Sequence, residues 1–411
     1  MKRFLCAVLA LCMVAVFLPA GVLAQEYIPE ELPGFLSGSW VNPLYEDLIT
    51  PPEAEIPNFY GIRMADDEDD IVFYTDPAAA AAQIRSGLAN REETVFVGYQ
   101  IPYDQYSNEG LYVIAMDILT AACAHTGVPN QGDYLEWQYG GGSFGAQGIG
   151  HNDTRTGYNA VISISVQYYT DAAQEQAVTN RVKQLLKELN PTGTDYEKLT
   201  TVYNWICDNV VYDNDHLEDT DYKTQYTAYA ALIDGTAVCQ GYALLLYRLA
   251  LEMGIDCRVI TGIGITATEI GGHAWNILKL DGKYYNVDAT WDTLYAENDD
   301  YAYYLQGEGI FDADHIRDGF YTSAEFSAAY PMAAEKYTPP AGGDDQYPAG
   351  DINGDTNVDE TDVIHLLWYT LFPDDYEIIG DADFNDDGNV DEDDVIYLLW
   401  HTLFPEDYPL N

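Results

Sequence analysis

The chain has 411 residues, of which 68 are acidic and 17 are basic, giving a formal net charge of −51. Such a surface repels nucleic acid and anionic lipid, so we expect neither as a partner, and it suits divalent cations instead. The length predicts about two or three domains.

The first 24 residues have the pattern of a secretory signal peptide. Lys2 and Arg3 precede an apolar run, and the small residues Val22 and Ala24 stand before Gln25. The run is too short for a stable membrane anchor, so we expect cleavage after Ala24. The sequence therefore predicts a secreted, extracellular protein without membrane insertion.

Cysteines are few in the mature chain. Two of the six belong to the leader, and the mature chain keeps Cys123, Cys207, Cys239 and Cys257. Four scattered cysteines do not make a disulfide scaffold. A bridge between Cys123 and Cys207, or between Cys207 and Cys257, stays open.

Residues 25–177 form a predicted α+β region without a catalytic motif. Residues 25–57 are rich in proline and are expected to be irregular, and the acidic run 65–70 is expected to be a solvated loop. Its spacing is not that of a calcium-binding loop.

Within this region, alternating apolar residues predict strands over 94–101 and 158–169, and helical periodicity predicts a helix over 112–127. The glycine-rich run 140–150 lacks the Lys-Ser/Thr pair of a phosphate-binding loop. We therefore expect a flexible connection there.

The following domain is predicted over 178–335. An amphipathic helix over 172–190 crosses its first boundary, and a second one lies over 195–213. A third, strongly apolar helix follows Cys239. At the amino end of a helix a thiolate is favoured by the helix dipole, so Cys239 is a candidate nucleophile.

A hairpin downstream supplies partners for this thiol. Residues 273–280 and 283–290 read as strands, and Asp281-Gly282 between them is a strong two-residue turn signal. With Leu280 facing Lys283, His273 lies on the same face as Asp288 and diagonal to it, about 7–8 Å away at the backbone. A His–Asp hydrogen bond is within reach.

Each residue alone also has an ordinary structural interpretation. Cys239 suits a buried core cysteine, His273 a strand histidine with its hydrogen bonds satisfied, and Asp288 a cap at the end of a strand. Taken together, and with Gly241 and the Gly271-Gly272 pair permitting close backbone approach, the three favour a catalytic set.

Here the sequence resembles the transglutaminase-like superfamily, through AVCQGYA around Cys239, GGHAWN around His273 and YNVDATWD around Asp288. The resemblance implies an α+β, papain-like core, in which the helix carrying the cysteine packs on an antiparallel sheet. It implies that Cys239 attacks a carbonyl, that His273 shuttles the proton, and that Asp288 holds the imidazole. No cofactor is expected in this domain.

Two details of the expected site stay open. The Cys239 amide is expected to stabilise the oxyanion, with Gln225 and Tyr229 as candidates for a second donor. Trp275 and Trp291 are expected mainly in the core, with a place along the acyl groove as the alternative.

After a predicted linker over 336–349, residues 350–411 contain the same motif twice, 32 residues apart. Oxygen-bearing residues recur at loop positions 1, 3, 5, 7, 9 and 12, where position 7 offers its backbone carbonyl, which is the pattern of a calcium loop. They are Asp351, Asn353, Asp355, Asn357, Asp359 and Asp362 in the first copy, and Asp383, Asn385, Asp387, Asn389, Asp391 and Asp394 in the second.

One helix follows each loop and none is expected before it, so this region resembles a type I dockerin. Thr356 replaces the usual glycine at loop position 6, whereas Gly388 is present in the second loop. The resemblance implies a small all-α domain with two Ca²⁺ ions that binds a cohesin module of a scaffoldin. The expected cohesin contacts are Leu367, Trp368, Phe372, Leu399, Trp400 and Phe404; the alternative is that these residues form the core between the helices.

The sequence therefore favours a secreted thiol hydrolase or acyltransferase acting on protein or peptide, attached through its dockerin to a cellulosome-like complex that degrades polysaccharide. One alternative is a non-catalytic adaptor that binds glycan or peptidoglycan in the same complex. Another is a glycoside hydrolase, although no carboxylate pair stands at a recognisable motif.

Overall fold

The computed structural model describes residues 31–41, 71–217, 219, 221–266, 270–295, 301–339, 349–354, 357–373, 376, 378–379, 382–385, 388–405 and 408–410. The predicted signal peptide, the acidic run 65–70 and most of the predicted linker lie outside these residues. So do Asp355 and Asp387 of the two predicted calcium loops.

The chain divides into two compact units. The first comprises residues 1–124 and 139–168, and the second comprises residues 125–138 and 169–411. Residues 125–138 thus belong to the second unit although they precede the boundary expected at residue 177.

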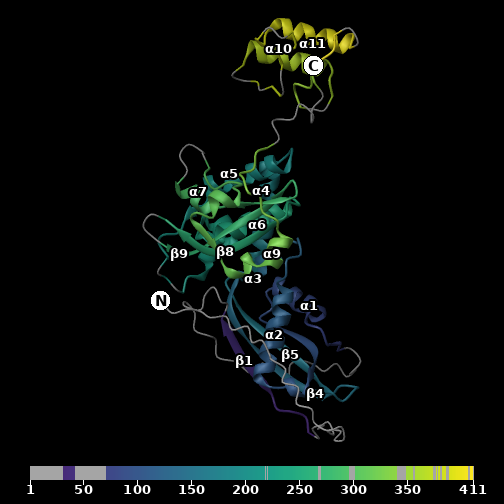
Figure 1. The fold of residues 1–411 in the computed structure, drawn as a ribbon, viewed down its shortest axis with the longest axis vertical. Coiled ribbons are helices and arrows are strands. Elements are labelled where there is room, and N and C mark those ends of the chain that lie inside the picture. The colour runs from purple at the N-terminus through teal and green to yellow at the C-terminus, as the bar shows by residue number, and fades with distance from the viewer. Residues whose placement is uncertain are drawn as a thin grey trace, which may run out of the picture. The chain divides into compact units, whose positions relative to one another are not determined.

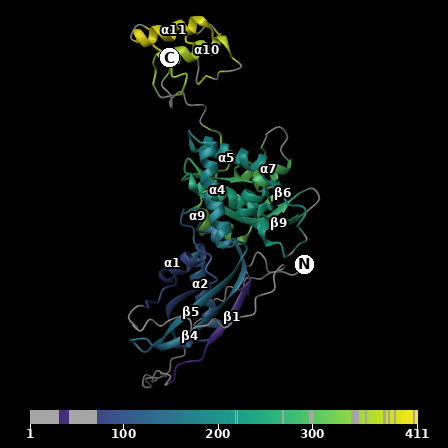
Figure 2. The ribbon, with the colours of Figure 1, turned by 180° about the vertical axis from the view of Figure 1, so that it is seen from behind.

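The first unit is built on a five-stranded sheet in the order β1-β4-β5-β3-β2. The strands are β1 (Leu36–Val41), β2 (Phe73–Tyr74), β3 (Thr94–Pro102), β4 (Tyr139–His151) and β5 (Gly157–Tyr168). Two helices, α1 (Pro77–Ala89) and α2 (Asn108–Ala122), lie side by side against this sheet (Figures 1 and 2). Ser107 caps α2 by accepting a hydrogen bond from the Gly110 amide.

Two expectations for this unit are wrong. The glycine-rich run is not a flexible connection but strand β4, which pairs with both β1 and β5. Its glycines make room for aromatic rings, because a Cβ at Gly142 would lie 2.4 Å from the Trp40 ring and one at Gly145 would lie 2.6 Å from Phe35. Residues expected to be irregular likewise include strand β1, which pairs along this glycine-rich strand.

Helices in the second unit follow the predicted pattern closely. Helix α4 (Ala172–Leu189) ends at Asn190, which adopts the left-handed conformation, and α5 (Asp195–Asn209) follows it. Both begin with capping boxes, from Asp171 and Thr194. Helix α6 (Cys239–Glu252) is buried from Gln240 to Leu251, as expected for a helix at the centre of a domain.

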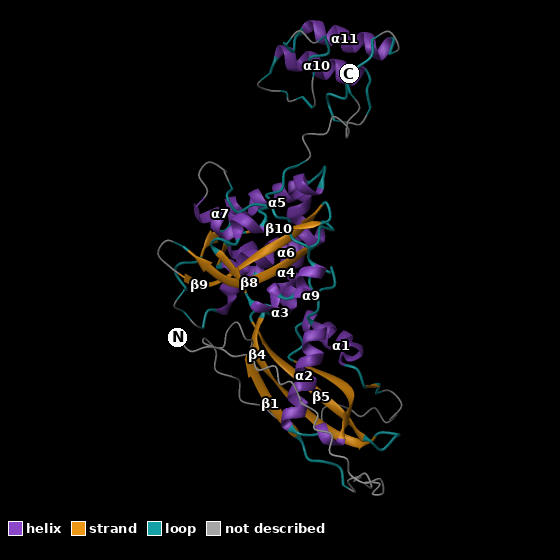
Figure 3. Cartoon of the chain, in the orientation of Figure 1, coloured by secondary structure: helices purple, strands orange, loops and turns teal. Residues whose placement is uncertain are grey.

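A four-stranded antiparallel sheet in the order β10-β9-β8-β11 packs against α6 (Figure 3). Its strands are β8 (Cys257–Ile265), β9 (Ile270–Leu280), β10 (Lys283–Val287) and β11 (His315–Arg317). The predicted hairpin register is confirmed, since Leu280 pairs with Lys283 and Asp281 and Gly282 both have positive φ in the turn. The second unit thus has the mixed α+β fold expected of a transglutaminase-like core.

Shorter elements complete this unit. The helices are α3 (Asp133–Glu136), α7 (Ala289–Tyr295), α8 (Glu308–Phe311) and α9 (Ala324–Ala329), and the strands are β6 (Val211–Tyr212) and β7 (Thr236–Ala237). Single turns of 3-10 helix occur at Tyr103–Gln105 in the first unit and at Lys223–Tyr226 and Gly319–Thr322 in the second, with a π-helical turn at Ala230–Asp234.

The C-terminal repeat contains helices α10 (Glu360–Leu371) and α11 (Glu392–Leu403), which pack on each other. Their shared core contains two equivalent pairs, Val363 with Val395 and Leu366 with Leu398, and also Ile352 and Ala382. Throughout the described ranges, no helix has both the length and the apolar character needed to cross a membrane.

Candidate functional site

Cys239 is the first residue of α6, after the extended Val238. The thiol is partly exposed, whereas the rest of the helix lies in the core. Gly241 lets the chain pass close beneath it, since a Cβ there would lie 2.6 Å from Ala237 and 2.9 Å from the Thr227 carbonyl oxygen. The sequence-based expectation of close backbone approach is confirmed at this glycine.

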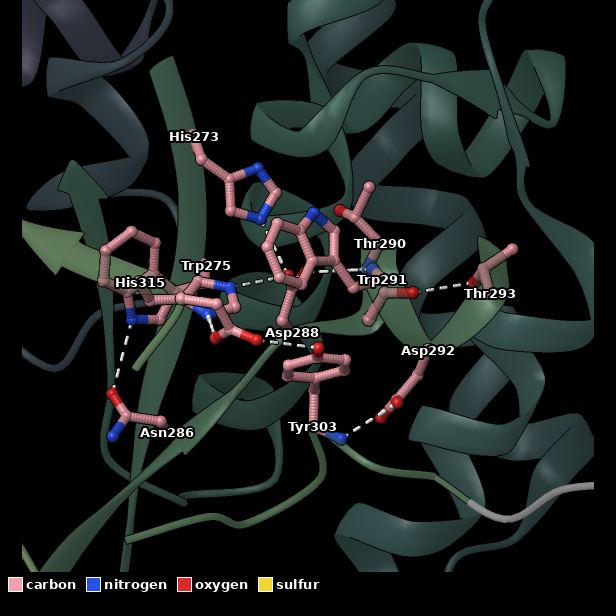
Figure 4. Close-up of polar contacts among 12 residues, drawn as sticks. His273, Trp275, Asn286, Asp288, Thr290, Trp291, Asp292, Thr293, Tyr303 and His315 are labelled. Carbon is pink, nitrogen blue, oxygen red and sulfur yellow. Dashed lines mark hydrogen bonds and ion pairs between the residues drawn. The ribbon is translucent and has the colours of Figure 1, made fainter. Parts of the chain in front are cut away.

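His273 and Asp288 form a buried charge-assisted pair. The His273 Nε2 atom lies 2.7 Å from the Asp288 Oδ2 atom, and the two side chains are 8% and 1% exposed (Figure 4). Burial alone would lower the pKa of His273, but the Asp288 carboxylate outweighs it and raises that pKa to about 10. Burial would raise the pKa of Asp288, and the two neighbouring imidazoles instead hold it well below its usual range.

Cys239 reaches the same imidazole. Besides Asp288, a hydrogen bond and a charge interaction with the Cys239 side chain contribute to the raised pKa of His273. Because Nε2 is bound to Asp288, Nδ1 is the ring nitrogen left for the sulfur. The helix end, the strand and the strand–helix junction thus bring Cys239, His273 and Asp288 into one line of contacts.

Asp288 is fixed by more than its histidine. Its Oδ1 atom accepts hydrogen bonds from the Thr290 and Trp291 amides, at 3.0 and 3.3 Å, at the start of α7. Its own amide donates to the Tyr303 carbonyl oxygen. Asp288 therefore caps a helix with one oxygen and holds an imidazole with the other.

A residue that the sequence did not indicate, His315 on β11, also contacts Asp288. Its Nε2 atom lies 3.2 Å from Asp288 Oδ2, and its Nδ1 atom lies 2.7 Å from Asp314 Oδ1. Figure 4 shows Asp288 between the rings of His273 and His315. No motif surrounds His315 in the sequence. The feature that could have indicated its place is the Gly-Ile-Gly run at 262–264, which lies on the neighbouring strand.

His273, Asp288 and His315 are close enough together to raise the question of a metal ion. Two ligands of one tetrahedral zinc ion, each about 2.0–2.2 Å from the metal, lie roughly 3.3 Å apart. The separation of 2.7 Å between His273 Nε2 and Asp288 Oδ2 is instead that of a direct hydrogen bond. The arrangement suits proton chemistry.

Of the two expected second oxyanion donors, Gln225 is engaged elsewhere. The Nε2 atom of Gln225 already donates to the carbonyl oxygens of His216 and Tyr222. Tyr229 directly precedes the π-helical turn and stays a candidate. Two other phenols lie near the sulfur. Burial raises the pKa of Tyr212 and of Tyr226, and the charge of Cys239 adds to the rise in each. Tyr212 pairs with Ala237, two residues before Cys239.

The remaining residues singled out around the site have structural places. Trp275 is 1% exposed within a hydrophobic cluster, and Trp291 packs on both His273 and His315. The close approach expected at Gly271-Gly272 is wrong, because a Cβ at either glycine would meet nothing within 4 Å.

Cys123, Cys207, Cys239 and Cys257 are all free in the described structure, so neither of the two open disulfide pairings occurs there.

The C-terminal loops repeat one arrangement of buried carboxylates. Asp362 is fully buried and accepts hydrogen bonds from the amides of Ile352, Asn353 and Asp359. Asp394 repeats this with the amides of Phe384, Asn385 and Asp391.

The other predicted ligands that the structure describes also lie in these loops. Asp351 is 2% exposed and accepts a hydrogen bond from the Gly354 amide, and Asp383 accepts one from the Gly388 amide. Asp359 and Asp391 are the N-caps of α10 and α11. Asn357 precedes the N-cap Asp359 by two residues, and Asn389 precedes the N-cap Asp391 by two residues. The donor set contains oxygen alone, which fits a hard cation such as calcium.

The six residues expected to contact a cohesin lie outside the core of the repeat. Their exposed fractions match from copy to copy: Leu367 39% and Leu399 40%, Trp368 42% and Trp400 41%, Phe372 47% and Phe404 49%. In both copies the tryptophan stacks on the phenylalanine, with ring centres 5.7 and 5.8 Å apart. The core between the helices is formed instead by Val363, Leu366, Val395 and Leu398.

Comparison with known proteins finds a family match that includes Cys239, His273 and Asp288. Residues 183–289 match the profile of the transglutaminase-like superfamily core. The kyphoscoliosis peptidase of Homo sapiens is 28% identical over 171 residues, which cover 37% of this chain and 25% of that protein. The chain therefore spans about a quarter of the length of this relative.

Solved structures give distant matches. A crystal structure of a TGase covers 32% of this chain and 41% of its own, at 14% identity and a TM-score of 0.25. The periplasmic domain of TgpA from Pseudomonas aeruginosa covers 38% of this chain and 70% of its own, at 11% identity and a TM-score of 0.23.

Proposed function

We propose that this protein catalyses thiol-dependent acyl transfer on protein or peptide substrates. The observation that carries the proposal is the line of contacts from Cys239 through His273 to Asp288, with the 2.7 Å pair buried behind a partly exposed thiol. A nucleophile, a base and a group that orients the base are the parts such catalysis needs.

In the first step the Cys239 thiolate attacks the carbonyl carbon of an amide, forming the carbon–sulfur bond. The carbon–nitrogen bond then breaks, and the departing nitrogen takes the proton carried by His273, leaving a thioester on the protein. Asp288 keeps the imidazole facing the sulfur and stabilises its charged form.

The oxyanion of the first step needs donors beside Cys239. The backbone amide of Cys239, at the positive end of α6, supplies one. We propose the Tyr212 hydroxyl as the second, because its strand runs beside the residues that lead into α6.

In the second step an acceptor attacks the thioester after losing a proton to His273, and the Cys239 thiolate leaves. Water as the acceptor gives hydrolysis, and an amine gives cross-linking. Both outcomes use the same three residues, so the proposal is acyl transfer in this broader sense.

We further propose that residues 350–411 are a dockerin that attaches the exported enzyme to a cohesin in a polysaccharide-degrading complex. The paired loops and helices support this, with two equivalent aromatic surfaces outside the core. Calcium would be held by the loop oxygens and would order the loops that begin the helices. The basic and apolar leader supports export.

The experiment compares the full mature chain with its Cys239→Ala variant on denatured proteins and peptide libraries, with reductant present and calcium supplied. Mass spectrometry reads both cleaved and cross-linked products. We expect products from the wild type alone, and a thioester-linked fragment on Cys239 when the reaction is stopped in acid.

Labelling with an iodoacetamide probe at neutral pH separates this proposal from a binding role. A thiolate paired with an imidazolium reacts quickly, whereas an ordinary core thiol reacts slowly. Identical product profiles from the wild type and Cys239→Ala, together with slow labelling, would refute catalysis and favour a non-catalytic adaptor.

A further inference from the structure

His315 stands between two carboxylates at the back of the candidate site. Its ring is completely buried, with Nε2 3.2 Å from Asp288 and Nδ1 2.7 Å from Asp314. Asp314 is in turn held by the Tyr303 hydroxyl, which donates to its second oxygen at 2.9 Å. The contacts that begin at Cys239 therefore continue past Asp288 for two more residues.

Both hydrogen-bond partners of this ring are carboxylates. Ionised carboxylates only accept hydrogen bonds, so an imidazole that serves one at each nitrogen has to donate from both. A ring with two N–H groups is an imidazolium. The packing agrees with a cation, because the ring lies flat on Phe311, with centres 3.9 Å apart, and 4.2 Å from the centre of Trp291.

The strand order of the sheet brings the two histidine rings close together. His315 on β11 pairs with Gly264 on β8, and His273 lies on β9 at the other side of that strand. A Cβ at Gly264 would lie 2.9 Å from Trp291 and 3.2 Å from the His273 Cβ. Glycine at this position leaves room for the rings, whose centres are 5.4 Å apart.

We propose that His315, held by Asp314, is a positioning residue of the thiol site, which fixes the Asp288 carboxylate and shares its negative charge with His273. The inference rests on the proposed acyl-transfer function. In this proposal His315 is a second cation of the site, and its role is to hold Asp288 and to share its charge. A carboxylate bound to two imidazolium rings attracts the His273 proton less strongly than one bound to His273 alone.

This sharing matters for turnover. The pKa of His273 is raised to about 10 even with His315 in place, and a still higher value would make the imidazolium a poorer proton donor to the leaving nitrogen. The titratable groups facing His315 are His273 from β9, Asp288 before α7, Asp312 and Asp314 from the segment after α8, and Tyr303.

The test uses the full mature chain with histidine rings labelled with nitrogen-15, and follows each ring by NMR as pH is varied. His315→Phe keeps a flat ring against Phe311 but removes both donors. His315→Gln keeps a donor for Asp288 but carries no charge. We expect two protonated nitrogens on His315 in the wild type, and titration of His273 about one pH unit higher in both variants.

A second readout separates position from charge. The rate at which iodoacetamide alkylates Cys239 at neutral pH should fall about tenfold or more in His315→Phe, and should be largely retained in His315→Gln. The matched control is His125→Phe, which breaks another His–Asp pair in the same unit, 2.9 Å from Asp256. It should lower thermal stability without moving the titration of His273.

An unchanged His273 titration in both His315 variants would overturn the inference, as would a His315 ring with a single proton in the wild type. The NMR readout does not depend on activity. Slow alkylation of wild-type Cys239 would therefore refute the proposed function by itself, while the His273 titration still decides whether His315 shares the charge of Asp288.

Discussion

Cys239, His273 and Asp288 come from a helix, a strand and a strand–helix junction, whereas the predicted oxygen ligands of each C-terminal loop come from about twelve consecutive residues. The thiol site lies on a buried helix and an antiparallel sheet. The loops contain buried carboxylates that need backbone amides or a cation around them. The comparison teaches that the first site takes its geometry from the core of a domain, whereas the arrangement of each loop is local and rests on the backbone amides that hold its buried carboxylate.

The largest effect should come from Asp288→Asn, which tests whether core geometry governs the thiol site. An amide keeps an oxygen for the α7 cap but cannot stabilise the imidazolium, so kcat on a peptide substrate should fall about 10³- to 10⁴-fold with little change in KM. Asp256→Asn, at the His125 pair, is the control. Equal losses in the two variants would contradict the assignment.

Calcium removal should act on the other region alone. With calcium at about 1,000 times its dissociation constant, binding stabilises the folded repeat by about 4 kcal/mol, so a chelator should make α10 and α11 sensitive to chymotrypsin. The alkylation rate of Cys239 should stay unchanged in the same sample. If the alkylation rate of Cys239 also falls when calcium is removed, the two sites are not independent of each other.

The repeat also predicts redundancy that the thiol site lacks. Because Trp368 and Trp400 occupy equivalent exposed positions, each alanine substitution alone should weaken cohesin binding by less than about threefold, and the pair by about 30-fold or more. Ile364→Ala and Ile396→Ala, at other exposed positions, are the controls. If a single tryptophan substitution abolishes binding, while circular dichroism shows the fold intact, only one surface is used.

A smaller effect is expected at Tyr212. If its hydroxyl donates to the oxyanion, Tyr212→Phe should lower kcat about tenfold, with thermal stability nearly unchanged. Tyr226→Phe is the matched comparison, because Tyr226 also senses the charge of Cys239 but does not lie on the strand beside Ala237. If Tyr212→Phe leaves kcat unchanged and Tyr226→Phe lowers it, Tyr226 rather than Tyr212 is the oxyanion donor.

The smallest effect is on stability at alkaline pH. His273 has a pKa raised from 6.5 to about 10, so the stability it contributes is fully present below pH 6.5 and is lost as pH rises through about 10. Urea unfolding at pH 7, 8.5 and 10 should show this decline, and His273→Gln should flatten it. A decline that persists in His273→Gln would assign it to other groups.

The elements that could be predicted are those with local signals. The Asp281-Gly282 turn gave the register that brings His273 to Asp288, and Asn190 marked the end of α4. The close backbone approach at Gly241 was predicted because this glycine lies two residues after Cys239.

What could not be predicted depends on distant neighbours. His315 meets Asp288 only because the edge strand β11 joins the sheet beside Gly264, and no sequence spacing records that pairing. Strand β4 was missed because its glycines indicate flexibility, whereas Trp40 and Phe35, about a hundred residues earlier, occupy the space above them.

Asp288 serves the fold and, in the proposed mechanism, the chemistry as well, whereas Cys239 would serve that chemistry more than the fold. Loss of the aspartate removes the cap of α7 and leaves two buried histidines without their shared partner, whereas Cys239→Ala removes one partly exposed sulfur at the start of an otherwise buried helix. Genetic drift toward an inactive descendant should therefore discard the thiol first. Such a pseudoenzyme would keep the aspartate and both histidines as relics of its ancestry.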